Sequence, residues 1–286
     1  MADFSHTVSG LGEAMRISEY LKGRLGFSRT LVTKVKYGNV YLNGEAVHMR
    51  AAVKDGDLIE VNFPEEASEG IPPIDIPLEV LYEDAHVLAV CKPTGMPTHP
   101  SRGNSLPTLG NAVMAYFGGD FVFRSITRLD RDTSGIVLIA KTPYAAARLS
   151  DDMKAGLWRK IYTTVVSGVP SEPEGRIDAP IRREREGDIR RIVAPDGKKA
   201  LTDYRLLKVG SDGNALLEIE LLTGRTHQIR VHMAHIGHAL VGDFLYGERR
   251  EGGYMLHCSR LDFTHPITRE VITVRSDVPF LKELTT

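Results

Sequence analysis

The sequence contains little cysteine, no long apolar run and no leader-like start. Only two of its 286 residues are cysteine, and Cys91 and Cys258 lie far apart without forming a C-x-x-C pair. This argues against a cysteine-based metal site and fits a reducing compartment. No run of about 18 apolar residues, the length of a membrane span, occurs, and MADFSHTVSG at the start lacks a secretory pattern. We therefore expect a soluble cytoplasmic protein with no membrane contact.

The chain also lacks a strong excess of charge of either sign. It has 36 Lys and Arg against 37 Asp and Glu, a formal net charge of −1. A nucleic-acid-binding protein that is basic throughout has a different balance, so any contact with phosphate must come from local patches. Hydrophobic residues make up 42% and charged residues 26%, values typical of a globular chain with a large core.

One such local patch lies between residues 16 and 50. It holds seven Lys and Arg against two acidic residues, a local charge of +5. Apolar residues recur at helical spacing over 17–25, and Ser28 is a candidate cap for a second helix. The turn pair Asn43-Gly44 predicts a hairpin after the helices. The pattern predicts a compact unit of two helices and short strands.

The stretches RISEYLKGRLGFSRTLVTKVKYGNVYLNGEAV and VKDGDLIEV resemble the S4-type RNA-binding domain over roughly residues 14–63. The resemblance implies a small α/β unit whose helices present basic side chains to the RNA backbone, here Arg16, Arg29, Lys34 and Lys36. From charge alone, these residues fit a solvated helix face equally well. We assign residues 1–63 to an S4-like RNA-binding domain.

Residues 64–77, PEEASEGIPPIDIP, are acidic and rich in proline, which predicts an exposed linker. In residues 78–286 the strand patterns fall at 80–82, 87–91, 136–140, 161–166, 215–222 and 271–274, and the helical patterns at 106–117, 144–153 and 225–235. That mixture predicts an α+β catalytic domain with a mixed, mainly antiparallel sheet. Residues 176–199 hold eight basic against five acidic residues and several turn signals, which predicts a basic insertion or hairpin.

The stretch SITRLDRDTSGIVLIAK places Asp130 and Asp132 beside two arginines, just before an apolar strand pattern. One interpretation is a salt-bridged turn, which adds little stability when exposed. A second is the D-x-D-x-T pattern of haloacid-dehalogenase-like phosphotransferases, which bind magnesium. In that family an apolar strand leads into the first aspartate, whereas here the strand follows it. A third interpretation depends on motifs elsewhere in the chain.

TRLDRDTSGIVLIAKT resembles the R-L-D-x-x-T-S-G motif of RluA/RluD-type RNA pseudouridine synthases. Four further stretches match that family in order and spacing: VLAVCKPTGMPTHP, RKIYTTVVSG, LLTGRTHQIRVHMAHIGHALVGDFLYG and LHCSRLDFTHP. The resemblance spans about residues 78–275. It implies the pseudouridine synthase fold and the isomerisation of uridine in RNA to pseudouridine, without a cofactor or a metal.

The resemblance also implies roles for individual residues. Asp130 is the catalytic carboxylate, acting as a nucleophile or by a glycal route, and Arg225 is its cationic partner. Tyr162 stacks on the uracil and helps to remove the proton from C5. Arg128 contacts RNA and takes the space left by the flipped base. Asp132 is structural and holds the turn that follows it.

The histidines His227, His232, His235 and His238 invite a zinc interpretation, but no glutamate or cysteine ligand lies beside them, and we expect no metal. The expected function is an RNA pseudouridine synthase acting on large-subunit (23S) ribosomal RNA, with structured RNA and not DNA as partner. The alternatives are a transfer RNA pseudouridine synthase, a non-catalytic RNA-binding or ribosome-assembly factor, and a magnesium-dependent phosphatase. A monomer is the default expectation.

Overall fold

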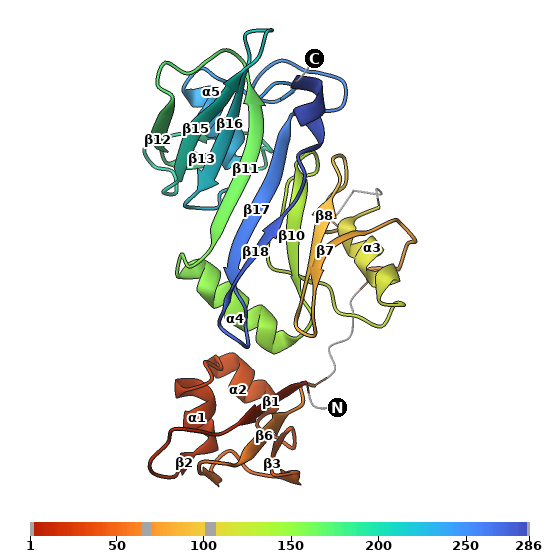
Figure 1. Ribbon diagram of the computed structural model, residues 1–286, viewed down its shortest axis with the longest axis vertical. Coiled ribbons are helices and arrows are strands. Elements are labelled where there is room, and N and C mark those ends of the chain that lie inside the picture. Colours follow the sequence, from red (N-terminus) through yellow and green to blue (C-terminus); the bar gives the residue numbers. More distant parts are fainter. Residues whose placement is uncertain (1–2, 65–69, 101–106, 285–286) are drawn as a thin grey trace.

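The computed structural model describes residues 3–64, 70–100 and 107–284, apart from the side chains of 282–284. A small N-terminal unit lies beside the end of a long sheet built from the rest of the chain (Figure 1). The unit packs two helices against a four-stranded sheet of order β1-β6-β3-β4. Its elements are β1 Phe4–Thr7, β2 Met15–Arg16, α1 Ile17–Gly23, α2 Arg29–Val35, β3 Val40–Leu42, β4 Glu45–Ala46, β5 Ala52–Val53 and β6 Leu58–Val61.

Two local signals produce the predicted start of α2 and the predicted hairpin. The Ser28 hydroxyl accepts a hydrogen bond at 3.1 Å from the amide of Leu31, one of the donors that a helix start leaves unpaired. Asn43 and Gly44 take positive φ values of 54° and 85°, and β3 pairs with β4 across them. Both predictions are confirmed. The sequence patterns do not predict β1, which is paired along its length with β6.

The remainder of the chain forms a ten-stranded sheet of order β12-β15-β16-β11-β17-β10-β8-β7, with β18 beside β17 and β9 beside β10. Among the described pairs β10 and β17 run parallel and the others antiparallel, so the expected mixed, mainly antiparallel sheet is confirmed. The strands are β7 Glu79–Glu83, β8 Val87–Lys92, β9 Arg124–Ser125, β10 Ser134–Ala140, β11 Arg159–Val166, β12 Glu174–Asp178, β15 Leu201–Val209, β16 Ala215–Leu221, β17 Leu256–Thr264 and β18 Val271–Arg275.

The predicted basic insertion contains a separate hairpin, β13 Ile181–Arg183 and β14 Arg191–Val193. The helices are α3 Leu109–Tyr116, α4 Pro143–Lys154 and α5 Gln228–His235, and a 3₁₀ helix follows at Pro279–Leu284. They are close to the predicted ones, although α5 begins three residues later than its pattern. Within the described ranges, no helix is both long and apolar enough to cross a membrane.

The described part of the proposed linker is held against α3. The side-chain amide of Asn111 donates to the Pro72 carbonyl at 2.7 Å, and the Ile74 amide donates to the Asn111 carbonyl at 3.2 Å. Residues 65–69 lie outside the described residues. The division of the chain into 1–63, 64–77 and 78–286 therefore stays a prediction.

Helix α4 joins the N-terminal unit to the large sheet. Tyr144, in its first turn, packs against the rings of Phe4 and Phe27 at centroid distances of 4.7 and 4.8 Å. Its hydroxyl donates to the Leu25 carbonyl at 2.7 Å. Near the other end of α4, Asp152 accepts two hydrogen bonds from Arg269, in the loop between β17 and β18. One helix therefore contacts both parts of the protein, as its place in Figure 1 indicates.

Gly135 allows β10 to run unusually close to β17. Its φ is +108°, a conformation that side chains disfavour, and a Cβ there would lie 2.6 Å from the Cys258 backbone nitrogen. The amide of Thr133 donates to the Asp130 carbonyl at 3.1 Å and closes the turn just before this contact. Gly135 thus fixes where the Asp130 loop enters the sheet.

Replacing Gly135 with alanine should lower the free energy of unfolding by about 3 kcal/mol or more, because backbone atoms must move to admit the methyl group. Urea unfolding followed by circular dichroism measures the change. Gly23→Ala is the control, since a Cβ at Gly23 meets nothing within 4 Å. A Gly135→Ala protein as stable as Gly23→Ala would contradict this reading of the strand contact.

Candidate active site

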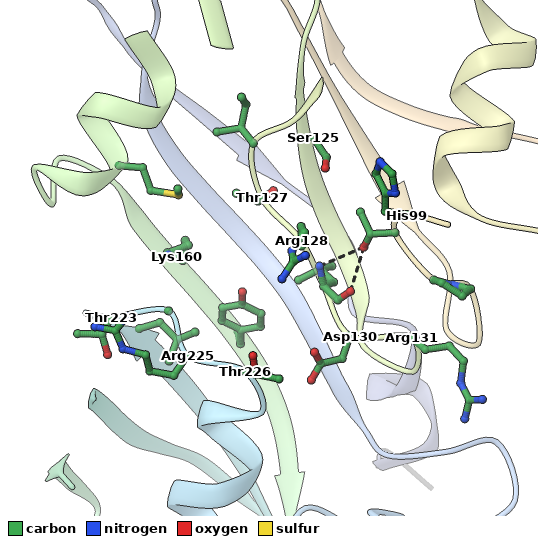
Figure 2. Close-up of a pocket in the computed structure, with 18 of the residues that line it drawn as sticks. His99, Ser125, Thr127, Arg128, Asp130, Arg131, Lys160, Thr223, Arg225 and Thr226 are labelled. Atoms are coloured by element: carbon green, nitrogen blue, oxygen red, sulfur yellow. Dashed lines mark hydrogen bonds between the residues drawn. The ribbon is translucent and has the colours of Figure 1, made fainter. Parts of the chain in front are cut away.

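A cleft of about 820 Å³ opens where the Asp130 loop faces the loop between β16 and α5. It continues into a smaller chamber of about 70 Å³. Figure 2 shows Asp130 and Arg128 on one side of the cleft, with Arg225 and Thr226 across from them. Six residues border both spaces: Arg128, Leu129, Asp130, Tyr162, Leu221 and Arg225. The structure thus brings together four of the site residues predicted for the large domain.

Asp130 is only partly buried, with 32% of its side chain exposed. Its Oδ2 lies 3.9 Å from Nη1 of Arg230 and 3.8 Å from Nε2 of His227. One side of the carboxylate is open to the cleft, and the other side faces Arg230 and His227 in the protein interior. The carboxylate is therefore held from behind and available to a ligand from the front.

Arg230, in α5, is fixed by a second carboxylate. It donates from Nε and Nη2 to Asp243 at 2.6 and 2.7 Å, a bidentate pair that leaves Nη1 directed toward Asp130. The ring of Tyr254 lies 4.3 Å from its guanidinium carbon. Burial alone would lower the pKa of Arg230, but the Asp243 hydrogen bonds and the nearby negative charges raise it. The guanidinium thus stays charged although its side chain is nearly inaccessible.

The arginine that the structure places beside Asp130 is Arg230, and not the predicted Arg225. Arg225 lies on the exposed rim of the cleft, and its Nε donates to the Lys199 carbonyl at 3.0 Å. The motif GRTHQIR offers two arginines five residues apart, and spacing does not distinguish them. Because α5 begins only at Gln228, Arg225 stays in the preceding loop while Arg230 projects from the helix toward Asp130.

Tyr162 borders the chamber from β11, at a break in the regular pairing with β17 between Ile161 and Tyr162. Such irregularities re-aim side chains near functional sites. Burial raises the pKa of the Tyr162 hydroxyl well above its usual value, and the neighbouring Cys258 and Asp130 add to the rise. The phenol is therefore protonated at neutral pH, and Tyr162 lines the same chamber as Asp130.

His227 is a neighbour of Asp130 that the sequence predictions did not assign to the site. It adopts the left-handed conformation with φ of 59° at the start of α5. The Tyr246 hydroxyl accepts from the Arg191 amide at 2.8 Å and lies 2.9 Å from Nδ1 of His227. Nδ1 is thus engaged with Tyr246, and Nε2 faces Asp130. Burial lowers the pKa of His227, so the ring is neutral at neutral pH.

A buried lysine clamps the loop that carries Asp130. Lys92, in the KPTG stretch, donates from Nζ to the carbonyls of Pro93, Met96 and Arg131 at 2.7–2.9 Å. Burial lowers its pKa to about 8, an effect that the charges of Asp132 and Asp130 oppose. Asp132 does not hold the following turn as predicted, because its carboxylate accepts two hydrogen bonds from Arg131.

The remaining residues considered from the sequence lie in three places. His232 uses both ring nitrogens, which lie 2.8 Å from the Thr202 hydroxyl and the Ala179 carbonyl, so its role is structural. Arg128 is exposed at the mouth of the chamber. The N-terminal cations lie on or beside α1 and α2, outside the residues that line the cleft: Arg16, Arg29, Lys34 and Lys36.

Fold and site together define an enzyme with one reactive carboxylate on the face of a polar cleft. Residues 86–235 match the family model described as RNA pseudouridylate synthase, and the chain belongs to this family of isomerases acting on RNA. The phosphatase interpretation fails structurally as well, because strand β10 follows Asp130 rather than leading into it.

Curated relatives agree with this assignment. An uncharacterized RNA pseudouridine synthase of Bacillus subtilis, YjbO, is 41% identical over 93% of this chain and 96% of its own length. A ribosomal large subunit pseudouridine synthase D of Xanthomonas campestris is 36% identical over 88% of this chain and 82% of its own. Among solved structures, human RNA pseudouridylate synthase domain containing 1 is similar, with a TM-score of 0.62 and 29% identity over 73% of this chain and 86% of that one.

Exchanging each arginine for lysine should separate the two roles. Arg230→Lys removes the bidentate contact with Asp243, so we expect kcat to fall by about 100-fold or more. Arg225→Lys keeps a cation on the rim and should change kcat less than about fivefold. Release of tritium from C5-labelled uridine in RNA measures both rates. Equal losses in the two variants, with both proteins folded, would refute this assignment.

Proposed function

We propose that this enzyme isomerises specific uridines of large-subunit ribosomal RNA, with Asp130 as its catalytic carboxylate. The observation that carries the catalytic assignment is the position of Asp130, on the boundary of cleft and chamber with Arg230 behind it. The RNA target is supported by the Xanthomonas relative, which is named for the large ribosomal subunit. A transfer RNA target is the alternative.

The reaction needs a carboxylate that stays ionised next to the ribose. Asp130 either attacks C1′ as the bond to the base nitrogen breaks, or removes a ribose proton to give a glycal. The detached uracil then turns and its C5 bonds to C1′. On the first route C5 displaces Asp130 and breaks the ester bond to C1′, and on the second route Asp130 returns the proton to the ribose. The C5 proton leaves last. Tyr162 lines the chamber, where its ring stacks on the uracil. Because its hydroxyl is protonated, it helps in this last step by passing its own proton to a neighbouring base as it takes the proton from C5.

The target base must leave its stack to enter the small chamber beside Asp130, because a base inside a helix is held by its pairing and stacking partners. Leu221, Ile229 and Leu256 supply apolar surface within it. Arg128 stands exposed at the mouth, where its planar guanidinium can fill the gap left in the stack. The narrow chamber takes the base, and the wide cleft takes the RNA around it.

The N-terminal unit acts as an S4-like RNA-binding domain that holds structured RNA through phosphate contacts. Its cations Arg16, Arg29 and Lys34 are exposed, and Lys36 is half-buried beside Tyr37. The contact of Tyr144 with this unit sets its position relative to the cleft. We also propose that the enzyme works in the cytoplasm, because its two cysteines are free thiols suited to a reducing compartment.

The target is tested by tritium release from C5-labelled transcripts of large-subunit ribosomal RNA and of transfer RNAs, made without modification. We expect release from the ribosomal transcript only, and none with Asp130→Asn, whose neutral amide neither attacks C1′ nor takes a proton. Filter binding checks that Asp130→Asn still binds RNA. Release from transfer RNA alone would show that transfer RNA is the target. Turnover by Asp130→Asn would show that Asp130 does not act in the reaction.

Replacing Arg16 and Arg29 together with alanine should weaken binding to the ribosomal transcript about tenfold and leave kcat almost unchanged. The slope of log K against log salt should fall by about 1.5, the loss expected for two phosphate contacts. Filter binding at several salt concentrations gives both quantities. Lys208→Ala, on β15 in the large sheet, is the control. Equal salt slopes in the two variants would argue against RNA contact by Arg16 and Arg29.

A further inference from the structure

We propose a second RNA site, a groove beside the cleft that binds the phosphates of the substrate strand next to the flipped uridine. The proposal rests on the proposed function, because it requires RNA in the cleft. The groove encloses about 530 Å³ between the β13–β14 hairpin and the loop 224–226. Its charged lining residues are Arg182, Arg183, Arg191, Asp196, Lys198 and Arg225. We call this space the basic groove.

The basic groove is continuous with the catalytic cleft. Gly224, Arg225 and Thr226 line both spaces, and Figure 2 shows Arg225 and Thr226 across the cleft from Asp130. An RNA strand that places one base in the chamber must lead its neighbouring phosphates out of the cleft. The rim at Gly224–Thr226 is one such exit, and the phosphates that pass over this rim enter the basic groove.

The charge of the groove fits a polyanionic backbone. Five cations face one carboxylate, Asp196, which pairs with Arg182 at 2.9 Å. Arg191 donates from Nη1 to the Asp188 and Ile189 carbonyls, and Arg225 donates to a carbonyl as well. Hydrogen bonds to carbonyls fix a guanidinium without neutralising it. In a chain of net charge −1, this is a local excess suited to phosphate.

The groove is built before any ligand binds. Ile181 and Lys198 exchange two backbone hydrogen bonds of 2.9 Å, and a Cβ on Gly197 would lie 2.7 Å from the Ile181 backbone. Ile181 also packs with Ala200 and with Val231 of α5, the neighbour of Arg230. A preformed site loses less entropy on binding. Phosphates in this groove would therefore lie in fixed register with the arginine behind Asp130.

The hairpin also touches the immediate surroundings of Asp130. The Arg191 amide donates to the Tyr246 hydroxyl, which contacts His227, whose Nε2 faces Asp130. An RNA strand bound in the groove would thus hold the hairpin in the position that keeps these contacts intact. The groove places the RNA and supports the geometry of the carboxylate without entering the chemistry.

The test uses Arg183→Ala combined with Lys198→Ala, two cations of the groove that do not contact the catalytic residues. The probe is the ribosomal transcript of the tritium-release assay, or the transfer RNA if that proves to be the substrate. We expect KM to rise about tenfold with kcat within twofold of wild type, and the salt slope of binding to fall by about 1.5. Arg185→Ala combined with Lys199→Ala is the matched control, from the same segment but outside the groove lining.

Three results would overturn the proposal while the wild-type enzyme remains active. The groove variant and the control variant could both bind RNA as tightly as the wild type, or both could bind it more weakly to the same degree. The second result would indicate an effect of general surface charge. Alternatively, kcat could fall with KM unchanged, which would indicate a structural effect through Tyr246. A wild-type enzyme that releases no tritium from either RNA would instead count against the proposed function itself.

Discussion

The structure of the site depends on one buried guanidinium placed between two carboxylates. Arg230 satisfies Asp243 with two of its nitrogens and presents the third to Asp130. Because Asp243 is fully buried, removing the arginine would strand a negative charge in the interior, a situation that costs several kcal/mol. The position of Asp130 is thus set by the interior of the protein and not by the cleft. The open face of its carboxylate is free for substrate.

The parts of the fold that depend on neighbouring residues could be predicted from the sequence. The Ser28 cap and the Asn43-Gly44 turn need only a few residues of context. The strand pattern at 136–140 sits in the fully buried β10, although the parallel contact with β17 depends on Gly135 and on a partner more than a hundred residues away. Strands such as β1 and β15, whose burial patterns are broken by exposed residues, escaped prediction because their partners determine them.

In the candidate site, too, some residues could be predicted from the sequence and others depend on distant partners. Motif resemblance located Asp130, Tyr162 and the arginine-bearing segment, and the structure brings all three to one cleft. It could not choose between Arg225 and Arg230, since that choice depends on the residue at which α5 begins. Nor could it find His227 as a neighbour of Asp130, because the ring is oriented by Tyr246 and, through it, by the hairpin at Arg191. Contacts that join three separate segments have no signature in linear order.

Helix α4 sets the separation between the N-terminal unit and the cleft. Its first turn is buried in the N-terminal unit through Tyr144, and its last residues, Met153 and Lys154, line the cleft. Twelve residues of helix span about 18 Å, and a helix shortens or lengthens only by whole residues, each of which also rotates its end by roughly 100°. The helix therefore keeps the N-terminal unit and the cleft at a fixed separation, which insertion or deletion can change only in steps of one residue, each with its own rotation.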